Sequence, residues 1–171
     1  MKTLSIVSLL MLLAFACQPQ NTVKEAIARI YPTAGNQAAG LITFSQEGKS
    51  IKITGEISGL TPGIHGFHIH QFGNLSSADG TSAGGHYNPL NARHGAPTDK
   101  ERHVGDLGNI TADDNGNATI NLTDNVISLN GKYSITGRAV VIHAGQDDFT
   151  TQPTGNAGAR VGYGVIGIAK E

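Results

Sequence analysis

The sequence predicts an all-β domain, built as an eight-stranded Greek-key β-sandwich or flattened barrel with long loops. The composition is the first observation, because 23 glycines and no tryptophan among 171 residues are typical of turn-rich β proteins. The second is a series of short runs rich in Val, Ile and Thr, which favour strands. Glycine- and asparagine-containing turn signals separate these runs. A chain of this length fits one domain with a substantial core.

Four strands are expected in the first half of the domain. The runs 23–31 and 40–45 are separated by the turn 32–36, and residues 50–57 alternate cleanly between apolar and polar side chains. A further turn at 61–63 leads into the strand that contains the segment Gly-Phe-His-Ile-His. These runs are short and closely spaced, as in β-sandwiches and barrels.

The second half begins with an irregular segment, residues 73–106, which has neither helical nor strand periodicity. A segment of that length inside a compact domain is usually functional. Four further strands are expected at 107–112, 117–122, 135–143 and 161–169. The predicted core contains Ile42, Ile51, Ile53, Phe67, Ile69, Ile120, Val140, Ile142 and Ile166.

The N-terminus has the features of an export signal. Lys2 precedes an apolar run, residues 6–16, that is too short for a membrane span. Residues 13–17 resemble a bacterial lipoprotein signal, which predicts cleavage before Cys17 and lipid attachment to it. An ordinary cleaved signal with an incidental cysteine is the alternative, because Ala14 stands where lipoprotein signals usually carry leucine.

The expected boundaries follow from that signal. Residues 1–16 are the signal peptide, residues 17–22 are the lipidated cysteine and a polar tether, and residues 23–171 are the domain. We expect the domain to lie in the cell envelope, on the periplasmic side or the outer surface. It contains no cysteine, so an internal disulfide is excluded. The net charge of −1 gives no sign of a nucleic-acid partner.

The histidines carry the strongest functional signal. His68 and His70 are separated by one residue, so in a strand both imidazoles leave the same face while Phe67 and Ile69 enter the core. The other candidate ligands follow along the chain: His86, His94, His103, Asp106 and His143. Three histidines and a carboxylate suit a tetrahedral zinc, and further imidazoles suit copper. A histidine that serves both metals points to redox chemistry.

Six segments occur in an order that resembles one family. They are GFHIHQFG, TSAGGHYNP, RHGAP, RHVGDLGN, GRAVVIHAGQDD and TGNAGARVGYGVIGIA. From about residue 23 to the C-terminus, the sequence resembles copper/zinc superoxide dismutases, in an exported, lipoprotein-like bacterial form. The resemblance implies an oxidoreductase that converts superoxide to oxygen and hydrogen peroxide, with one copper and one zinc per subunit.

The same resemblance implies a role for each candidate ligand. Copper is expected at His68, His70, His86 and His143, and zinc at His86, His94, His103 and Asp106. His86 is then the bridge between the metals, and it is expected to accept and deliver a proton as copper cycles between Cu(II) and Cu(I).

Three further residues match family positions. Arg160 is expected beside the copper, where a guanidinium can hold a small anion, and Thr154 is expected to narrow the channel opposite. Asp147 is expected to hydrogen-bond one copper histidine and one zinc histidine, by resemblance His68 and His94. Asp148, its neighbour, is the alternative for that role.

The sequence also departs from the family pattern. Relatives usually have a disulfide between the ligand loop and the last strand, and the matching positions here are Gly80 and Tyr163. We therefore expect residues 73–85 to be more mobile, since such a crosslink contributes about 2–4 kcal/mol, and Tyr163 to pack under that loop. The stretch 147–154 is short and lacks the Lys and Glu residues that usually steer superoxide, so steering should be weaker.

The oligomeric state and the function are the last two predictions from the sequence. Val165 and Ile168 are retained at family interface positions whereas Thr136 replaces an apolar residue, and we expect a homodimer. A catalytically weak domain that buffers or delivers copper and zinc is the alternative function. The retention of His143 and Arg160 favours the enzyme, and a copper-only relative would lack zinc ligands that are present here.

Overall fold

Nine antiparallel strands make up almost all of the regular structure in the computed structural model, which describes residues 22–171. The strands are β1 (Glu25–Pro32), β2 (Ala39–Glu47), β3 (Ser50–Ser58), β4 (Gly63–His70), β5 (Asp106–Ala112), β6 (Ala118–Asp124), β7 (Ala139–His143), β8 (Arg160–Val165) and β9 (Gly167–Lys170). Two single turns of 3-10 helix, η1 (Thr81–Ala83) and η2 (Gly131–Tyr133), lie in the connections.

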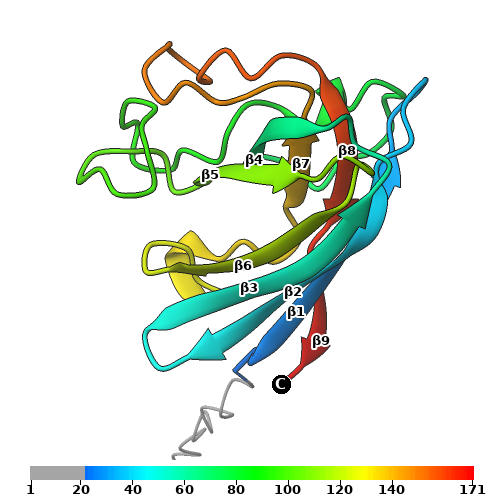
Figure 1. The fold of residues 1–171 in the computed structure, drawn as a ribbon. Coiled ribbons are helices and arrows are strands. Elements are labelled where there is room, and N and C mark those ends of the chain that lie inside the picture. Colours follow the sequence, from blue (N-terminus) through cyan, green and yellow to red (C-terminus); the bar gives the residue numbers. More distant parts are fainter. Residues whose placement is uncertain (1–21) are drawn as a thin grey trace, which may run out of the picture.

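The strands follow one another in the order β5-β4-β7-β8-β1-β2-β3-β6, and β9 pairs with β1. This path curls into a nearly closed antiparallel barrel, with β4, β5, β7 and β8 facing β1, β2, β3 and β6 (Figure 1). Strand β1 belongs to both faces, because it pairs with β2 and β9 along its first residues and with β8 at Tyr31 and Pro32. The expected all-β fold is confirmed.

The core lies between the two faces and is formed by alternate residues of the strands. In β3, Ile51, Ile53 and Ile57 are buried, whereas the residues between them are partly or fully exposed. The nine residues predicted for the core are all buried, namely Ile42, Ile51, Ile53, Phe67, Ile69, Ile120, Val140, Ile142 and Ile166. Period-two patterning therefore identified the inner face correctly.

Strand β4 is buried on both faces, for two different reasons. Phe67 and Ile69 point into the core. His68 and His70 point to the opposite face, and they are buried because the long loops fold over them. The strand thus connects the apolar core directly to the candidate metal ligands.

Two expected strands differ from the structure. The expected strand 135–143 begins only at Ala139, because Ile135 and Arg138 belong to a turn in which the Arg138 N–H donates to Ile135 O. The expected strand 161–169 is divided at Ile166, whose N–H donates to Arg138 O. This break lets β8 pair with β7 and lets β9 pair with the other end of β1.

The expected signal segment 1–16, Cys17 and the tether up to residue 21 lie outside the described residues. Among residues 22–171, no helix is long and apolar enough to span a membrane.

Strand β4 generates the first prediction. Phe67→Ala should lower the free energy of unfolding by roughly 3–5 kcal/mol, because it empties a fully buried aromatic position. Ile64→Ala is the matched control in the same strand, since Ile64 is 42% exposed and should cost less than about 1 kcal/mol. Urea denaturation of the two metal-free variants tests this, and equal losses would contradict it.

Candidate metal centre

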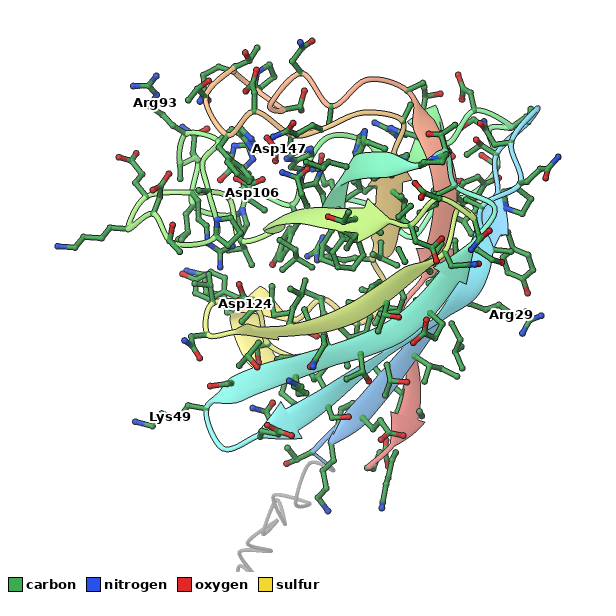
Figure 2. The ribbon with its side chains drawn as sticks, in the orientation of Figure 1. Arg29, Lys49, Arg93, Asp106, Asp124 and Asp147 are labelled. Carbon is green, nitrogen blue, oxygen red and sulfur yellow. The ribbon has the colours of Figure 1, made fainter. Side chains whose placement is uncertain are left out.

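The candidate ligands gather into two buried clusters on the loop side of β4. The first contains His68, His70, His86 and His143, and the second contains His86, His94, His103 and Asp106. Within each cluster, the ligand atoms lie within 4.8 Å of one another. Figure 2 shows Asp106 and Asp147 inside the loop region, whereas Arg29 and Lys49 lie on the opposite part of the barrel.

Strand pairing and loop contacts place the first cluster. His68 and His70 belong to β4, and His143 ends β7 after an irregularity in its pairing with β8. His86 comes from the long loop, which lies alongside β4 through a single bridge between His70 and His86. The neighbouring Tyr87 N–H donates to Ile69 O at 2.8 Å and fixes this contact.

The first cluster presents unprotonated nitrogens to its centre. His70 Nδ1 donates to Gly84 O at 2.9 Å and His143 Nδ1 donates to Gly158 O at 3.1 Å, so each Nε2 is left with a lone pair. These two Nε2 atoms lie 3.2 Å apart. Two lone pairs at that distance repel each other, and a shared cation turns the repulsion into coordination.

Two more buried nitrogens of this cluster, His68 Nδ1 and His86 Nε2, have no hydrogen-bond partner among residues 22–171. Burying an unpaired polar atom is costly, so such atoms mark a place for a ligand. Four imidazoles with inward lone pairs form a donor set that suits copper.

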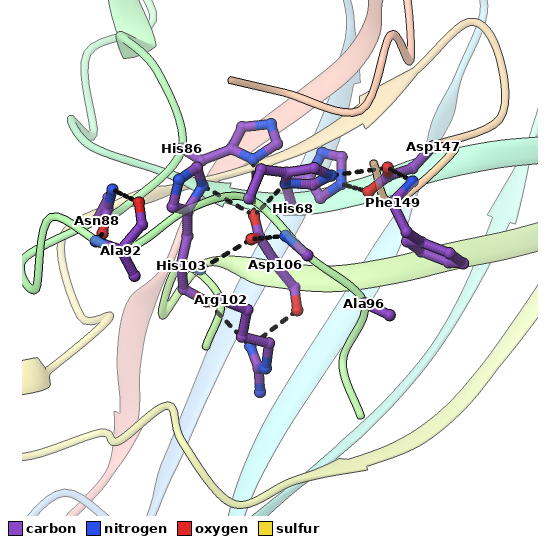
Figure 3. A network of polar contacts seen from close by, with 12 residues as sticks. His68, His86, Asn88, Ala92, Ala96, Arg102, His103, Asp106, Asp147 and Phe149 are labelled. Carbon is purple, nitrogen blue, oxygen red and sulfur yellow. Dashed lines mark hydrogen bonds and ion pairs between the residues drawn. The ribbon is translucent and has the colours of Figure 1, made fainter. Parts of the chain in front are cut away.

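The second cluster is arranged around one carboxylate oxygen. Asp106 Oδ1 lies 2.8 Å from His86 Nδ1, 3.1 Å from His94 Nδ1 and 3.1 Å from His103 Nδ1. Asp106 Oδ2 accepts the backbone N–H groups of Gly95 and His103, which fixes the carboxylate in place (Figure 3). Three imidazoles and one carboxylate are a common zinc donor set.

His86 belongs to both clusters through different atoms of one ring. Its Nδ1 faces Asp106 and the second cluster, whereas its unpartnered Nε2 faces the first. An imidazole that has lost its proton can bind one cation at each nitrogen. The geometry of His86 therefore fits a bridge between two metals.

Asp147 connects the two clusters through hydrogen bonds with one histidine of each. Its Oδ2 accepts a hydrogen bond from His68 Nε2 at 2.7 Å and its Oδ1 accepts one from His94 Nε2 at 2.8 Å. Both rings are thereby oriented with Nδ1 toward the ligand clusters. Asp147 is fully buried, whereas the exposed Asp148 accepts hydrogen bonds from Thr150 and Thr151. The geometry places Asp147, and not Asp148, between the two histidines.

Burial and the carboxylates act on the histidines in opposite directions. Burial lowers the pKa of His143 to about 3 and the pKa of His86 to about 4, which keeps these rings neutral. Burial also opposes protonation of His94, but contacts with Asp106 and Asp147 outweigh it and raise its pKa to about 9. Burial works against ionised Asp106 too, but the three histidines hold its pKa far below the usual range. In the metal-free protein, the proton on His94 therefore supplies part of the positive charge that a bound zinc ion would supply.

Arg160 stands next to the first cluster. Its guanidinium donates to Gly80 O and Gly84 O, and Gly84 O also accepts the hydrogen bond from His70 Nδ1. Thr154 is partly buried and precedes Gly155, whose backbone lies against the Asp147 carboxylate and His94 Nε2. Gly155 has a φ of +67°, and any side chain there would collide with Asp147. The 147–154 stretch is thus fastened closely over the second cluster.

The ligand loop is held without a covalent link to β8. Tyr163 and Leu75 pack against the buried side chains of Ala83, Ala139 and Val141. Tyr163 therefore packs under the loop as expected from the sequence.

Sequence reasoning missed two residues that hold the second cluster. Arg102 pairs with Asp124 in a buried ion pair and donates to the carbonyl oxygen of Asp106 at 2.8 Å. Gln152 donates to His94 O and accepts from His94 N–H, both at 2.9 Å. The position of Arg102 directly before His103 could have indicated a role near the second cluster. No neighbouring residue in the sequence indicates such a role for Gln152.

A family model described as copper/zinc superoxide dismutase matches residues 38–166. The chain belongs to the copper/zinc superoxide dismutase family. It is 48% identical over 158 residues to the extracellular superoxide dismutase [Cu-Zn] of Haemonchus contortus, covering 86% of each chain. It is 51% identical over 140 residues to superoxide dismutase [Cu-Zn] 3 of Arabidopsis thaliana, covering 78% of this chain and 85% of the relative.

A solved structure agrees with this membership. The crystal structure of the clock protein EA4 has a TM-score of 0.81 and 45% identity, and the match covers 88% of this chain and 98% of that one. Copper/zinc superoxide dismutases use copper and zinc, and the two clusters fit both metals.

The protonation of His94 generates the second prediction. Zinc needs a neutral imidazole, so zinc binding near pH 7.5 should displace roughly one proton from His94, whose pKa is about 9. Zinc affinity should therefore rise with pH until about 9 and then level off. Calorimetric titration of the metal-free protein in two buffers of different ionisation enthalpy counts the protons, and the absence of release at pH 7.5 would contradict the prediction.

Proposed function

We propose that this chain is an exported superoxide dismutase that disproportionates superoxide to oxygen and hydrogen peroxide. Membership of the family and the names of the relatives support the activity. The observation that carries the proposal is the position of His86, whose two ring nitrogens face two different buried donor clusters.

In the proposed site, His68, His70, His86 and His143 hold copper, and His86, His94, His103 and Asp106 hold zinc. Bound copper supplies a one-electron couple that alternately oxidises and reduces superoxide. His86 Nε2, which has no hydrogen-bond partner among residues 22–171, would take up one proton when it is not bound to the metal and would give it to the reduced product, with the second proton of hydrogen peroxide coming from solvent. Asp147 keeps the His68 and His94 rings oriented through its hydrogen bonds with their Nε2 atoms.

Arg160 and Thr154 are proposed to receive the substrate. Burial is the main cause that lowers the pKa of His70 and His143, and the positive charge of the half-buried Arg160 guanidinium adds to both shifts, so this charge acts on the proposed copper cluster. A permanently charged, forked donor beside that cluster favours a small anion such as superoxide. Thr154, the last residue of the 147–154 stretch, is proposed to lie opposite Arg160 and to limit the width of the substrate channel there.

We propose that the protein is secreted and attached to the cell envelope by lipid on Cys17. The extracellular relatives from Haemonchus contortus and Brugia pahangi support an exported location. The lipid and the periplasmic or outer-surface position rest on the resemblance of residues 13–17 to a lipoprotein signal. Mass spectrometry of the mature N-terminus tests the modification directly.

A homodimer is proposed to form through the outer face of β1, β8 and β9. Ile27, Val165 and Ile168 are exposed apolar side chains on these neighbouring strands. Sedimentation of the metal-loaded protein tests the dimer.

The third prediction concerns the activity of the protein loaded with copper and zinc. Residues 18–171 with both metals should consume superoxide rapidly in a direct kinetic measurement, and Arg160→Ala should lower turnover roughly 10-fold or more without loss of either metal. The expected loss follows from removal of the anion-binding charge. Full metal occupancy with negligible turnover would favour the metal-buffering alternative, and loss of copper from Arg160→Ala would contradict the role of Arg160.

The shared histidine generates the fourth prediction. His86→Ala should abolish most activity and weaken both metals, because each cluster loses a donor. His65→Ala is the control, since His65 is a buried histidine of β4 whose nitrogens, among residues 22–171, contact only His143 O and the backbone and hydroxyl of Thr61. It should alter stability more than metal stoichiometry. Unchanged metal content and rate in His86→Ala would overturn the bridge.

A further inference from the structure

The β1–β2 hairpin makes contacts with Arg160 that the proposed function leaves unexplained. Regular pairing of β1 with β8 covers only Tyr31 and Pro32. Beyond Pro32, the chain turns toward β2, yet Thr33 continues the contact with β8. The Thr33 N–H donates to Val161 O at 3.2 Å, and the Thr33 hydroxyl donates to Arg160 O at 2.6 Å.

Thr33 is well placed to fix the Arg160 backbone. Its relative exposure is only 3%, so its hydrogen bond to Arg160 is shielded from competing water. The Asn36 side-chain amide donates to the Thr33 hydroxyl at 2.9 Å, which directs the hydroxyl proton toward Arg160 O. Arg160 is the first residue of β8, and it pairs with His143 next to an irregularity in the β7–β8 register.

The hairpin also holds the ligand loop. The Ala34 N–H donates to Ala78 O at 2.7 Å. Farther along the loop, Gly80 O and Gly84 O accept hydrogen bonds from the Arg160 guanidinium. Gly80 is also packed against the Arg160 stem and the Thr33 methyl group, both within 3.4 Å of where a Cβ on Gly80 would stand.

These contacts form a closed ring. The ring runs from Thr33 to the Arg160 backbone, through the guanidinium to Gly80, back along the loop to Ala78, and then to Ala34. No disulfide is available to it, because residues 22–171 contain no cysteine. Hydrogen bonds therefore hold the loop against β8.

We propose that Thr33 is a positioning residue for Arg160, and that the β1–β2 hairpin is a non-covalent clasp that sets the guanidinium beside the copper cluster. The proposal rests on the role of Arg160 in the proposed function. Thr33 forms hydrogen bonds with Val161, Arg160 and Asn36, and none of these is a candidate metal ligand. Its influence passes through the Arg160 backbone to the guanidinium, which also shares the acceptor Gly84 O with His70.

Azide binding to the full domain loaded with copper and zinc tests the clasp, with visible absorption as the readout. Thr33→Val keeps the shape of the side chain but removes the hydroxyl, and it should weaken azide binding roughly 3- to 10-fold. Copper and zinc content should stay unchanged. Thr33→Ser restores the hydroxyl and should bind azide as the parent does.

A double variant separates positioning from general loosening. Adding Thr33→Val to Arg160→Ala should cause no further loss of azide affinity, because the clasp acts only through Arg160. Ser134→Ala is the matched control, since it removes a hydroxyl that donates to Leu129 O at 2.8 Å away from the site, and it should leave azide binding unchanged. Additive losses in the double variant would overturn the proposal.

The remaining outcomes distinguish the clasp from the proposed function. If Arg160→Ala weakens azide binding but Thr33→Val does not, the clasp is wrong and the role of Arg160 stands. If Arg160→Ala leaves azide binding unchanged, both are wrong. Should Thr33→Val fail to fold, the exposed Asn36→Ala removes the bond that orients the hydroxyl and should give a smaller loss in the same direction, and no loss would overturn the clasp.

Discussion

The site depends on one electrostatic constraint: histidine lone pairs and carboxylate charges are held close together, and this arrangement is stable only when cations lie between them. His70 Nε2 and His143 Nε2 face each other at 3.2 Å, and three histidine nitrogens converge on Asp106 Oδ1. Hydrogen bonds from the rings to Asp147, Gly84 and Gly158 hold the rings in these orientations. Because His86 contributes one nitrogen to each cluster, we propose that the two metals are coupled through its ring. The loops enclose lone pairs and carboxylate charge that two bound cations would balance.

The barrel and the loops contribute to the site in different ways. The barrel fixes His68, His70 and His143 through buried strands whose other faces form the core. Asp106 begins β5, whereas His86, His94 and His103 come from the irregular segment before it and are held largely by polar contacts. Asp147 spans the clusters, and Arg160 ties the ligand loop to β8. A domain without a disulfide thus relies on metals and hydrogen bonds for the order of its loops.

Much of the fold was predictable because its signals are local. Alternation placed Phe67 inside and His68 outside, and it identified the nine core residues. The division at Ile166 was not predictable, because it depends on pairing with Arg138 and β1, which are distant in the sequence. The candidate ligands were found from residue type and resemblance. The side chains of Gln152 and Thr33 form hydrogen bonds with backbone atoms of His94 and Arg160, and such contacts leave no pattern in the sequence.

The central claim is that the His86 ring joins the two metals, and magnetic coupling tests it most directly. Copper(II) is placed in the first cluster and cobalt(II) in the second, so that both ions are paramagnetic. A bridging imidazolate should couple them, and the copper resonance should lose most of its intensity while the copper content stays constant. The copper–zinc form provides the reference signal. An undiminished copper signal with both sites filled would show that His86 does not bridge the metals, and would contradict this account of the site.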